Sequence, residues 1–258
     1  MGADVCVGYR SRHNDAAVMR DALTALGVKG SSLAVDIGSA AGAQALVDHA
    51  VRELGGLDIL VHSAGVWPVE ETPVHEMTDE RWARTMRENV DATFYISRAA
   101  ARAMMAGHAR LTGAAGSMRA SGQTPHAGIS PVSSRPGAAH GGGRIVLVDS
   151  TAGQRGEAMH ADYAASKGAI ISFVKSMAVE LASYDITVNA VAPGWVDTEM
   201  CALLFRDGGR ERIAADIPVG RVASADDIAF PIVSLCFDGA RHITGEIVNV
   251  NGGSILCG

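Results

Sequence analysis

The sequence has little of what disulfide-bonded or metal-binding proteins need. Its nine histidines show no H-x-x-x-H or H-E-x-x-H spacing, so we expect no metal site, and we expect His62 to be a polar residue at a strand end rather than a ligand. No two cysteines form a C-x-x-C pair, which is typical of reduced thiols in a reducing compartment. The four cysteines are Cys6, Cys201, Cys236 and Cys257.

An excess of basic charge is also absent. The formal net charge is -6, which leaves no basic surface for the backbone of a nucleic acid. No apolar run reaches the roughly 18 residues that a membrane span requires, and the first residues lack the charged-then-apolar pattern of a signal peptide. We therefore expect a soluble, cytoplasmic protein without nucleic-acid or membrane partners.

The sequence is rich in short hydrophobic runs. Hydrophobic residues make up 48% of its 258 positions, enough to bury one large core. Strands that are apolar throughout alternate with helical patterns, which predicts a single α/β domain with a parallel sheet covered on both faces. The expected strands are 4–9, 31–38, 57–65, 144–150, 186–194 and 246–253, and the expected helices are 14–26, 41–54, 79–105 and 163–182.

The predicted helix at 79–105 is followed by a segment of different composition. Apolar residues recur in the helix at every fourth position and predict one buried face. Residues 107–143 are rich in Gly, Ser, Ala and Pro and nearly free of large apolar side chains. Such a segment buries too little apolar surface to offset the conformational entropy that it would lose on folding, so we expect a flexible insertion there. The recurring apolar residues of the helix are Trp82, Met86, Val90 and Phe94.

A tyrosine and a lysine stand four positions apart in "YAASKGA", residues 163–169. Four residues are about one helical turn, so Tyr163 and Lys167 lie on one face of the predicted helix. A tyrosine hydroxyl has a pKa of about 10, and a nearby ammonium group favours the phenolate. The pair therefore predicts a proton-transferring tyrosine that is tuned by a lysine.

Further residues complete a resemblance to a known family. Ser150 stands thirteen residues before Tyr163, "HSAG" follows a predicted strand, "ENV" lies in the long helix and "APGWVDT" follows a later strand. With Tyr163 and Lys167, these segments resemble the short-chain dehydrogenase/reductase family over nearly the whole chain apart from the insertion. The members that look most similar are the 3-oxoacyl-acyl-carrier-protein reductase and glucose dehydrogenase types. The resemblance implies a Rossmann-like, doubly wound parallel sheet.

The resemblance also implies a catalytic tetrad. Tyr163 would protonate a carbonyl oxygen as hydride arrives at the carbon, or remove the hydroxyl proton in the reverse direction. Lys167 would also hold the nicotinamide ribose, Ser150 would orient the substrate oxygen, and Asn89 of "ENV" would hold a water in the proton relay.

For the cofactor, the residues that follow the strand at 4–9 are informative. Family members that prefer NAD usually carry an acidic residue there, whereas this chain has Tyr9 followed by "RSR". Arg10, with Arg12 as a second candidate, favours the 2′-phosphate of NADP over NAD; the alternative is that these arginines only solvate a turn. The resemblance implies that the cofactor groove is lined by Arg10, Ser11, Asp36, Ile37, Ala64, Gly65, Tyr163, Lys167, Pro193, Gly194, Val196 and Thr198.

One family segment has no counterpart in the sequence. Members normally begin with a strand and a T-G-x-x-x-G-x-G turn, whereas this chain starts at "MGADV". In the family, the missing strand lies in the middle of the sheet and its turn approaches the cofactor pyrophosphate. We expect a gap between the strands at 4–9 and 57–61, explained by a misplaced start or a truncation rather than by another fold.

These observations predict an NAD(P)-dependent oxidoreductase that interconverts a ketone and a secondary alcohol. Apolar residues after Thr198 favour NADPH-dependent reduction of a 3-oxoacyl thioester or a similar apolar ketone. The alternatives are a sugar or polyol dehydrogenase, or a non-catalytic remnant that associates with intact homologues. The helix at 163–182 and the last strand resemble family surfaces that form homodimers and homotetramers. The apolar residues after Thr198 are Met200, Leu203, Leu204 and Phe205.

Overall fold

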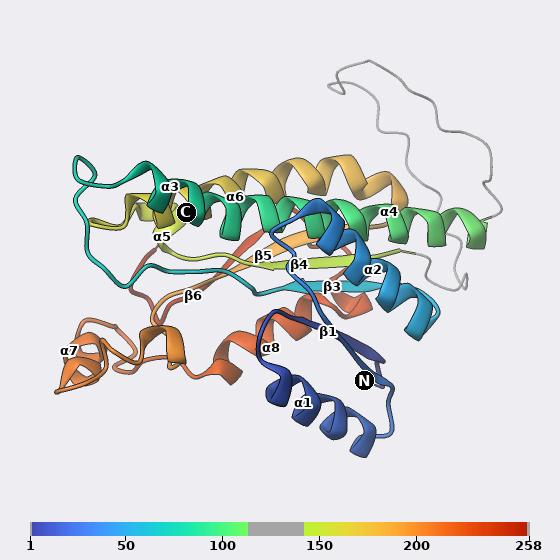
Figure 1. Ribbon diagram of the computed structural model, residues 1–258, viewed down its shortest axis with the longest axis horizontal. Coiled ribbons are helices and arrows are strands. Elements are labelled where there is room, and N and C mark those ends of the chain that lie inside the picture. Colours follow the sequence, from blue (N-terminus) through green and yellow to red (C-terminus); the bar gives the residue numbers. More distant parts are fainter. Residues whose placement is uncertain (1, 113–141, 257–258) are drawn as a thin grey trace.

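The computed structural model describes residues 2–112 and 142–256, and Figure 1 shows a sheet with helices on both faces. The chain therefore has the α/β architecture that the sequence predicts. The flexible insertion expected at about 107–143 lies mostly outside the described residues. Its first residues, 107–112, belong to helix α4 (Ala92–Thr112).

The described strands form two parallel sheets. One sheet pairs β1 (Val5–Tyr9) with β2 (Gly30–Ala34), in the register Val5 opposite Gly30. The other sheet has the strand order β3-β4-β5-β6, with all neighbours parallel. Parallel pairing confirms the sequence prediction. The bounds of these four strands are β3 (Ile59–His62), β4 (Arg144–Val148), β5 (Thr187–Pro193) and β6 (Ile247–Val250).

Helices cover both faces of the four-stranded sheet, with α2, α4 and α6 on one side and α8 on the other (Figure 1). Every residue of β5 is buried, as expected for a strand packed on both faces. No helix in residues 2–112 or 142–256 is long and apolar enough to cross a membrane. The helix bounds are α1 (His13–Ala25), α2 (Ala40–Leu54), α6 (Ala161–Leu181), α7 (Gly209–Ala215) and α8 (Ala225–Leu235).

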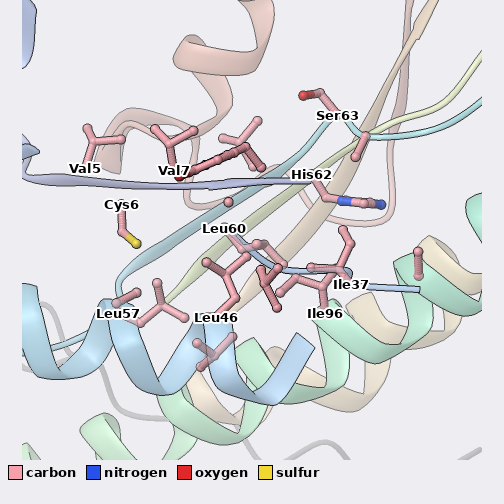
Figure 2. Close-up of a pocket in the computed structure, with 18 of the residues that line it drawn as sticks. Val5, Cys6, Val7, Ile37, Leu46, Leu57, Leu60, His62, Ser63 and Ile96 are labelled. Carbon is pink, nitrogen blue, oxygen red and sulfur yellow. The ribbon is translucent and has the colours of Figure 1, made fainter. Parts of the chain in front are cut away.

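A cleft of about 1160 Å³ separates the two sheets. It lies between β1 and β3, and Figure 2 shows Val5, Val7 and Leu60 among the apolar side chains that line it. In β3, Ile59 and Val61 are 36% and 45% exposed, although strands of a parallel sheet are normally buried. The predicted gap between the strands at 4–9 and 57–61 is therefore confirmed.

The predicted helix at 79–105 is divided into three parts. These parts are α3 (Asp79–Met86), a π-helical turn (Arg87–Asp91) and α4. The extra backbone residue of a π turn changes the direction in which later side chains point. One continuous apolar stripe therefore does not describe the buried face of the whole segment.

The predicted buried face of this segment was wrong in part. Trp82 is 44% exposed and Phe94 is 39% exposed, whereas Thr85, Asn89 and Thr93 are each 1% exposed. The buried residues are polar but hydrogen-bonded, and Thr85 Oγ1 donates to Asp162 Oδ2 at 2.7 Å. Hydrogen bonding removes the cost of burying a polar group, so hydrophobic periodicity alone selected the wrong stripe.

An ion pair joins α3 to the first turn of α6. Arg81 Nε donates to Asp162 Oδ2 at 3.1 Å, and the Asp162 side chain is 0% exposed. The Arg81 guanidinium also lowers the pKa of Asp162, against the effect of burial. Because Tyr163 follows Asp162 in the chain, this pair fixes the start of the helix that carries the predicted catalytic tyrosine.

Candidate active site and cofactor groove

Helix α6 brings Tyr163 and Lys167 together on one face, as predicted. The Lys167 ammonium lies 5.7 Å from the centre of the Tyr163 ring, and Lys167 Nζ donates to the Val148 carbonyl oxygen at 2.9 Å. Burial lowers the pKa of Lys167. Burial also raises the pKa of Tyr163, and this effect is larger than that of the hydrogen bond with Ser150, which lowers it. The phenol is therefore protonated in this structure.

Ser150 lies beside Tyr163 directly after the end of β4. Its hydroxyl contacts the Tyr163 side chain, and its Oγ accepts a hydrogen bond from the Ala152 backbone N–H at 3.1 Å. The short helix α5 (Ala152–Arg155) starts at this point and packs on α6. The hydroxyl groups of Ser150 and Tyr163 are therefore adjacent, and the Lys167 ammonium lies near the Tyr163 ring.

Asn89 lies in the π-helical turn and connects a loop to α6. Its Oδ1 accepts from the Val66 backbone N–H at 2.7 Å, and its Nδ2 donates to Val66 O at 3.0 Å and to Ser166 Oγ at 2.9 Å. Both Nδ2 hydrogens are used by these bonds. Asn89 therefore holds the loop after β3 against the helix that carries Tyr163 and Lys167.

The residues predicted to bind the adenosine half of the cofactor line the cleft between β1 and β3. Arg10 and Asp36 are exposed, and Arg10 Nη1 donates to Glu88 Oε2 at 2.9 Å. Asp36 Oδ1 accepts from the Gly38 backbone N–H at 2.9 Å. The cleft lining includes six of the predicted residues, Arg10, Ser11, Asp36, Ile37, Ala64 and Gly65.

Gly65 connects this cleft to the tetrad. A methyl group placed on Gly65 would lie 3.0 Å from Asn89 Oδ1 and 3.8 Å from Lys167 Nζ. Only a residue without a side chain leaves this space open next to the ammonium group. The predicted ribose-binding lysine and the adenosine side of the groove therefore meet at Gly65.

The remaining predicted cofactor residues follow β5. The Gly194 N–H donates to Val250 O at 3.1 Å, Val196 forms a parallel bridge with Ala223, and Thr198 precedes the 3₁₀ turn Glu199–Cys201. The Cys201 thiol contacts the Thr198 side chain and interacts electrostatically with Tyr163. This segment therefore runs past the tetrad and reaches the cleft at Glu199, which pairs with the cleft residue Arg12.

A dinucleotide fits the two ends of this site. The open space at Gly65 beside Lys167 suits a nicotinamide ribose, and Arg10 with Asp36 suits an adenosine. Between these ends, in the part of the chain that the structure describes, the cleft holds no glycine-rich turn that would present several backbone N–H groups to a pyrophosphate. Both candidates for the 2′-phosphate are ion-paired in this structure, Arg10 with Glu88 and Arg12 with Glu199 and Asp15.

Sequence reasoning predicted only one member, Phe205, of a group of aromatic side chains near the tetrad. Trp67 stacks on His160 with 4.8 Å between ring centres, and Trp195 meets Trp67 at 6.2 Å and Phe205 at 6.5 Å. Trp67 Nε1 donates to Glu157 Oε1 at 3.2 Å, and Glu157 interacts electrostatically with Tyr163. These residues come from separate loops, so no local spacing in the sequence links them.

The buried His62 gives a testable pH dependence. It lies at the end of β3, as predicted, and burial followed by the charge of Lys167 lowers its pKa from 6.5 to about 4. The unfolded chain binds a proton below pH 6.5 that the folded chain excludes until about pH 4. The contribution of His62 to the free energy of unfolding should therefore fall by about 3 kcal/mol as the pH drops through this window.

Urea unfolding between pH 4 and pH 7 measures this effect. His62→Gln replaces the imidazole, whose Nε2 lies 3.1 Å from Thr93 Oγ1, with an amide that does not titrate. Between pH 7 and pH 4 the unaltered chain should lose about 3 kcal/mol relative to this variant. His75→Gln, at an exposed position, should leave the loss unchanged. An equal loss in the His62→Gln chain would show that another group causes the acid sensitivity.

Comparisons with known proteins agree with this arrangement. A family model described as "Enoyl-(Acyl carrier protein) reductase" matches residues 1–133 and 132–254. The chain is 33% identical over 255 residues to the 3-oxoacyl-[acyl-carrier-protein] reductase of Escherichia coli strain K12, covering 99% of this chain and 88% of that protein.

Solved structures show the same similarity. The acetoin dehydrogenase of Enterobacter cloacae has a TM-score of 0.77 at 27% identity, covering 98% of this chain and 86% of that chain. A short-chain glucose/ribitol dehydrogenase from Brucella melitensis has a TM-score of 0.76 at 27% identity, covering 99% and 88%. On the tetrad geometry and these matches together, the chain belongs to the short-chain dehydrogenase/reductase family of oxidoreductases.

Proposed function

We propose that this chain catalyses the NADPH-dependent reduction of a ketone to a secondary alcohol. The observation that carries the proposal is the cluster of Ser150, Tyr163 and Lys167 next to the open space at Gly65. A hydroxyl donor, a second hydroxyl and an ammonium group together suit the transfer of one proton to a carbonyl oxygen.

Each residue of the cluster has a distinct task in the reaction. NADPH, when bound, supplies the hydride that reaches the carbonyl carbon. Ser150 donates a hydrogen bond that orients the carbonyl oxygen, and Tyr163 gives its phenolic proton to the same oxygen. The Lys167 ammonium stabilises the phenolate that remains, and Asn89 keeps the loop at Gly65 in place. The phenol regains its proton from solvent before the next turnover.

We propose a 3-oxoacyl thioester or a similar apolar ketone as the substrate. Trp67, Trp195 and Phe205 form an apolar wall near Tyr163, which suits an acyl chain better than a polyol. Loss of NADPH absorbance with a 3-oxoacyl thioester, compared with NADP reduction by glucose or ribitol, tests this choice. Turnover with the sugars alone would support the polyol alternative, which the similarity to a glucose/ribitol dehydrogenase favours.

The choice of NADPH over NADH predicts a selective effect at Arg10. The Arg10→Ala chain loses a guanidinium that suits a 2′-phosphate, so NADPH should bind roughly tenfold more weakly while NADH binding stays nearly constant. Titration of both cofactors, followed by nicotinamide fluorescence, measures the two affinities. Arg20→Ala, at an exposed position on α1, serves as the control. Equal losses for NADPH and NADH would remove the 2′-phosphate role.

We also propose that the chain forms homodimers or homotetramers. Phe94 on α4 and Val179 on α6 are 39% and 63% exposed, and Phe94 meets Phe173 of α6 edge-on at 6.2 Å. An apolar surface that spans two helices is typical of a protein interface. Light scattering of the purified chain tests this assembly, and co-purification with an intact homologue instead would support the remnant alternative.

A further inference from the structure

A buried carboxylate next to the tetrad has no assigned role. Asp149 follows β4 directly and is 3% exposed, and apart from an interaction with the Ser150 backbone N–H its carboxylate oxygens have no hydrogen-bond partner. Its backbone N–H donates to Val191 O at 2.8 Å, which fixes its position beside β5. A buried charge without a partner is costly, so a nearby group must compensate for it.

The alternation of side chains along β4 gives the direction of Asp149. Residues two apart in a strand share a face, so Asp149 lies on the face of Leu147. Leu147 packs in the cluster that includes Ile96 of α4 and Val174 of α6. Asp149 therefore lies on the side of the sheet that α6 covers, which is the side from which Lys167 approaches.

Three titratable groups face this position. Lys167 is 6% exposed and its Nζ donates to the carbonyl oxygen of Val148, one peptide bond from Asp149. Tyr163 interacts electrostatically with Asp149 and is uncharged when its phenol is protonated. His62 lies opposite Leu147 on β3, and because burial lowers its pKa to about 4 it is neutral near pH 7. Of these three side chains, Lys167 is therefore the one that can carry a positive charge beside Asp149.

The other buried acid of the region is already paired. Asp162 accepts hydrogen bonds from Arg81 and Thr85 and needs no further partner. Asp149 and Lys167, by contrast, interact electrostatically with each other. Each side chain is more than nine-tenths buried, where attraction between opposite charges is strong.

We propose that Asp149 is a positioning residue, the buried counter-ion that keeps Lys167 in its ammonium form next to Tyr163. This role rests on the function proposed above, because it acts through Lys167. The negative charge of Asp149 raises the pKa of Lys167 against the effect of burial. Burial in turn raises the pKa of Asp149 to about 7, so the carboxylate and the ammonium titrate as a coupled pair.

The chain has only three lysines, Lys29, Lys167 and Lys175, which makes the pair directly measurable. Labelling with lysine that carries ¹³C at the ε position gives three signals whose pH titrations can be followed by NMR. The Lys167 signal should titrate below the ordinary lysine range, because burial lowers the pKa of Lys167, and Lys29 and Lys175 are exposed. Asp149→Asn should lower the Lys167 midpoint further, by about one pH unit or more.

Two further variants and the unaltered chain complete the test. Asp149→Ser should act like Asp149→Asn, and Asp21→Asn, at an exposed position on α1, should change no lysine midpoint. In the unaltered chain, the Lys167 signal should also show an inflection near pH 7, where Asp149 titrates. An unchanged Lys167 midpoint in a folded Asp149 variant, or no inflection near pH 7, would overturn the proposal. No measurement here requires cofactor or turnover, so failure of the proposed function leaves this test intact.

Discussion

Replacement of Tyr163 by phenylalanine should reduce ketone reduction by about 10²–10⁴-fold or more, the usual contribution of a positioned acid. The change removes only the phenolic oxygen, which is the group that contacts Ser150. The ring that lies 5.7 Å from the Lys167 ammonium stays in place. The expected result is therefore a large loss of kcat with cofactor binding nearly intact, measured by NADPH oxidation and by NADPH titration of the same sample.

A control variant shows whether the loss of activity is specific to the Tyr163 hydroxyl or follows from removing any tyrosine hydroxyl. Tyr95 lies on α4 and contacts Phe94 and Arg98 rather than the tetrad. Tyr95→Phe should therefore keep its activity. Turnover by the Tyr163→Phe chain at a rate close to that of the unaltered protein would contradict the catalytic assignment.

Replacement of Asp162 by alanine should lower the free energy of unfolding by about 3 kcal/mol or more, because it removes one partner of a buried ion pair. Arg81, whose side chain is 15% exposed, would lose its carboxylate, and the buried Thr85 hydroxyl would lose its acceptor. The first turn of α6 would also lose its connection to α3. Urea unfolding with circular dichroism measures the loss.

The comparison for this prediction is Asp79→Ala, an exposed position in the first turn of α3. That change should cost less than about 1 kcal/mol, since exposed charges near a helix start contribute little. A cost of similar size for Asp162→Ala would mean that the Arg81 pair does not stabilise the start of α6.

The parallel sheet and the tetrad could be predicted from the sequence because local patterns encode them. Continuous apolar runs identified β4 and β5, which are buried as parallel strands should be. The four-residue spacing of Tyr163 and Lys167 placed both side chains on one turn of α6. Similarity to the family then gave the position of the gap, which the break between β1 and β3 confirms.

Other features depend on contacts between distant segments, and the sequence did not reveal them. The buried face of α3 and α4 is polar because Thr85 and Thr93 find partners on other elements, whereas the exposed Trp82 and Phe94 look like core residues in a helical pattern. The apolar wall brings together Trp67, Trp195 and Phe205 from separate loops. Asp149 becomes notable only in the folded chain, where it is buried and interacts electrostatically with Lys167.

The predicted apolar segment after Thr198 divides in the structure. Phe205 joins the apolar wall through Trp195, but Met200 and Leu203 are 45% and 56% exposed. Closure over a bound substrate would be needed to bury them, as is common for segments at the mouth of an active site. Hydrophobicity alone did not distinguish the residues that pack from those that remain exposed.

We expect the groove from Arg10 through Gly65 to Lys167 to bind a nicotinamide dinucleotide although a cleft divides the two sheets. The most direct test is titration of the purified 258-residue chain with NADPH, followed by nicotinamide fluorescence, with NADH for comparison. We expect saturable binding that is tighter for NADPH than for NADH. No binding of either cofactor by a soluble, folded sample would contradict it, and would favour the non-catalytic remnant instead.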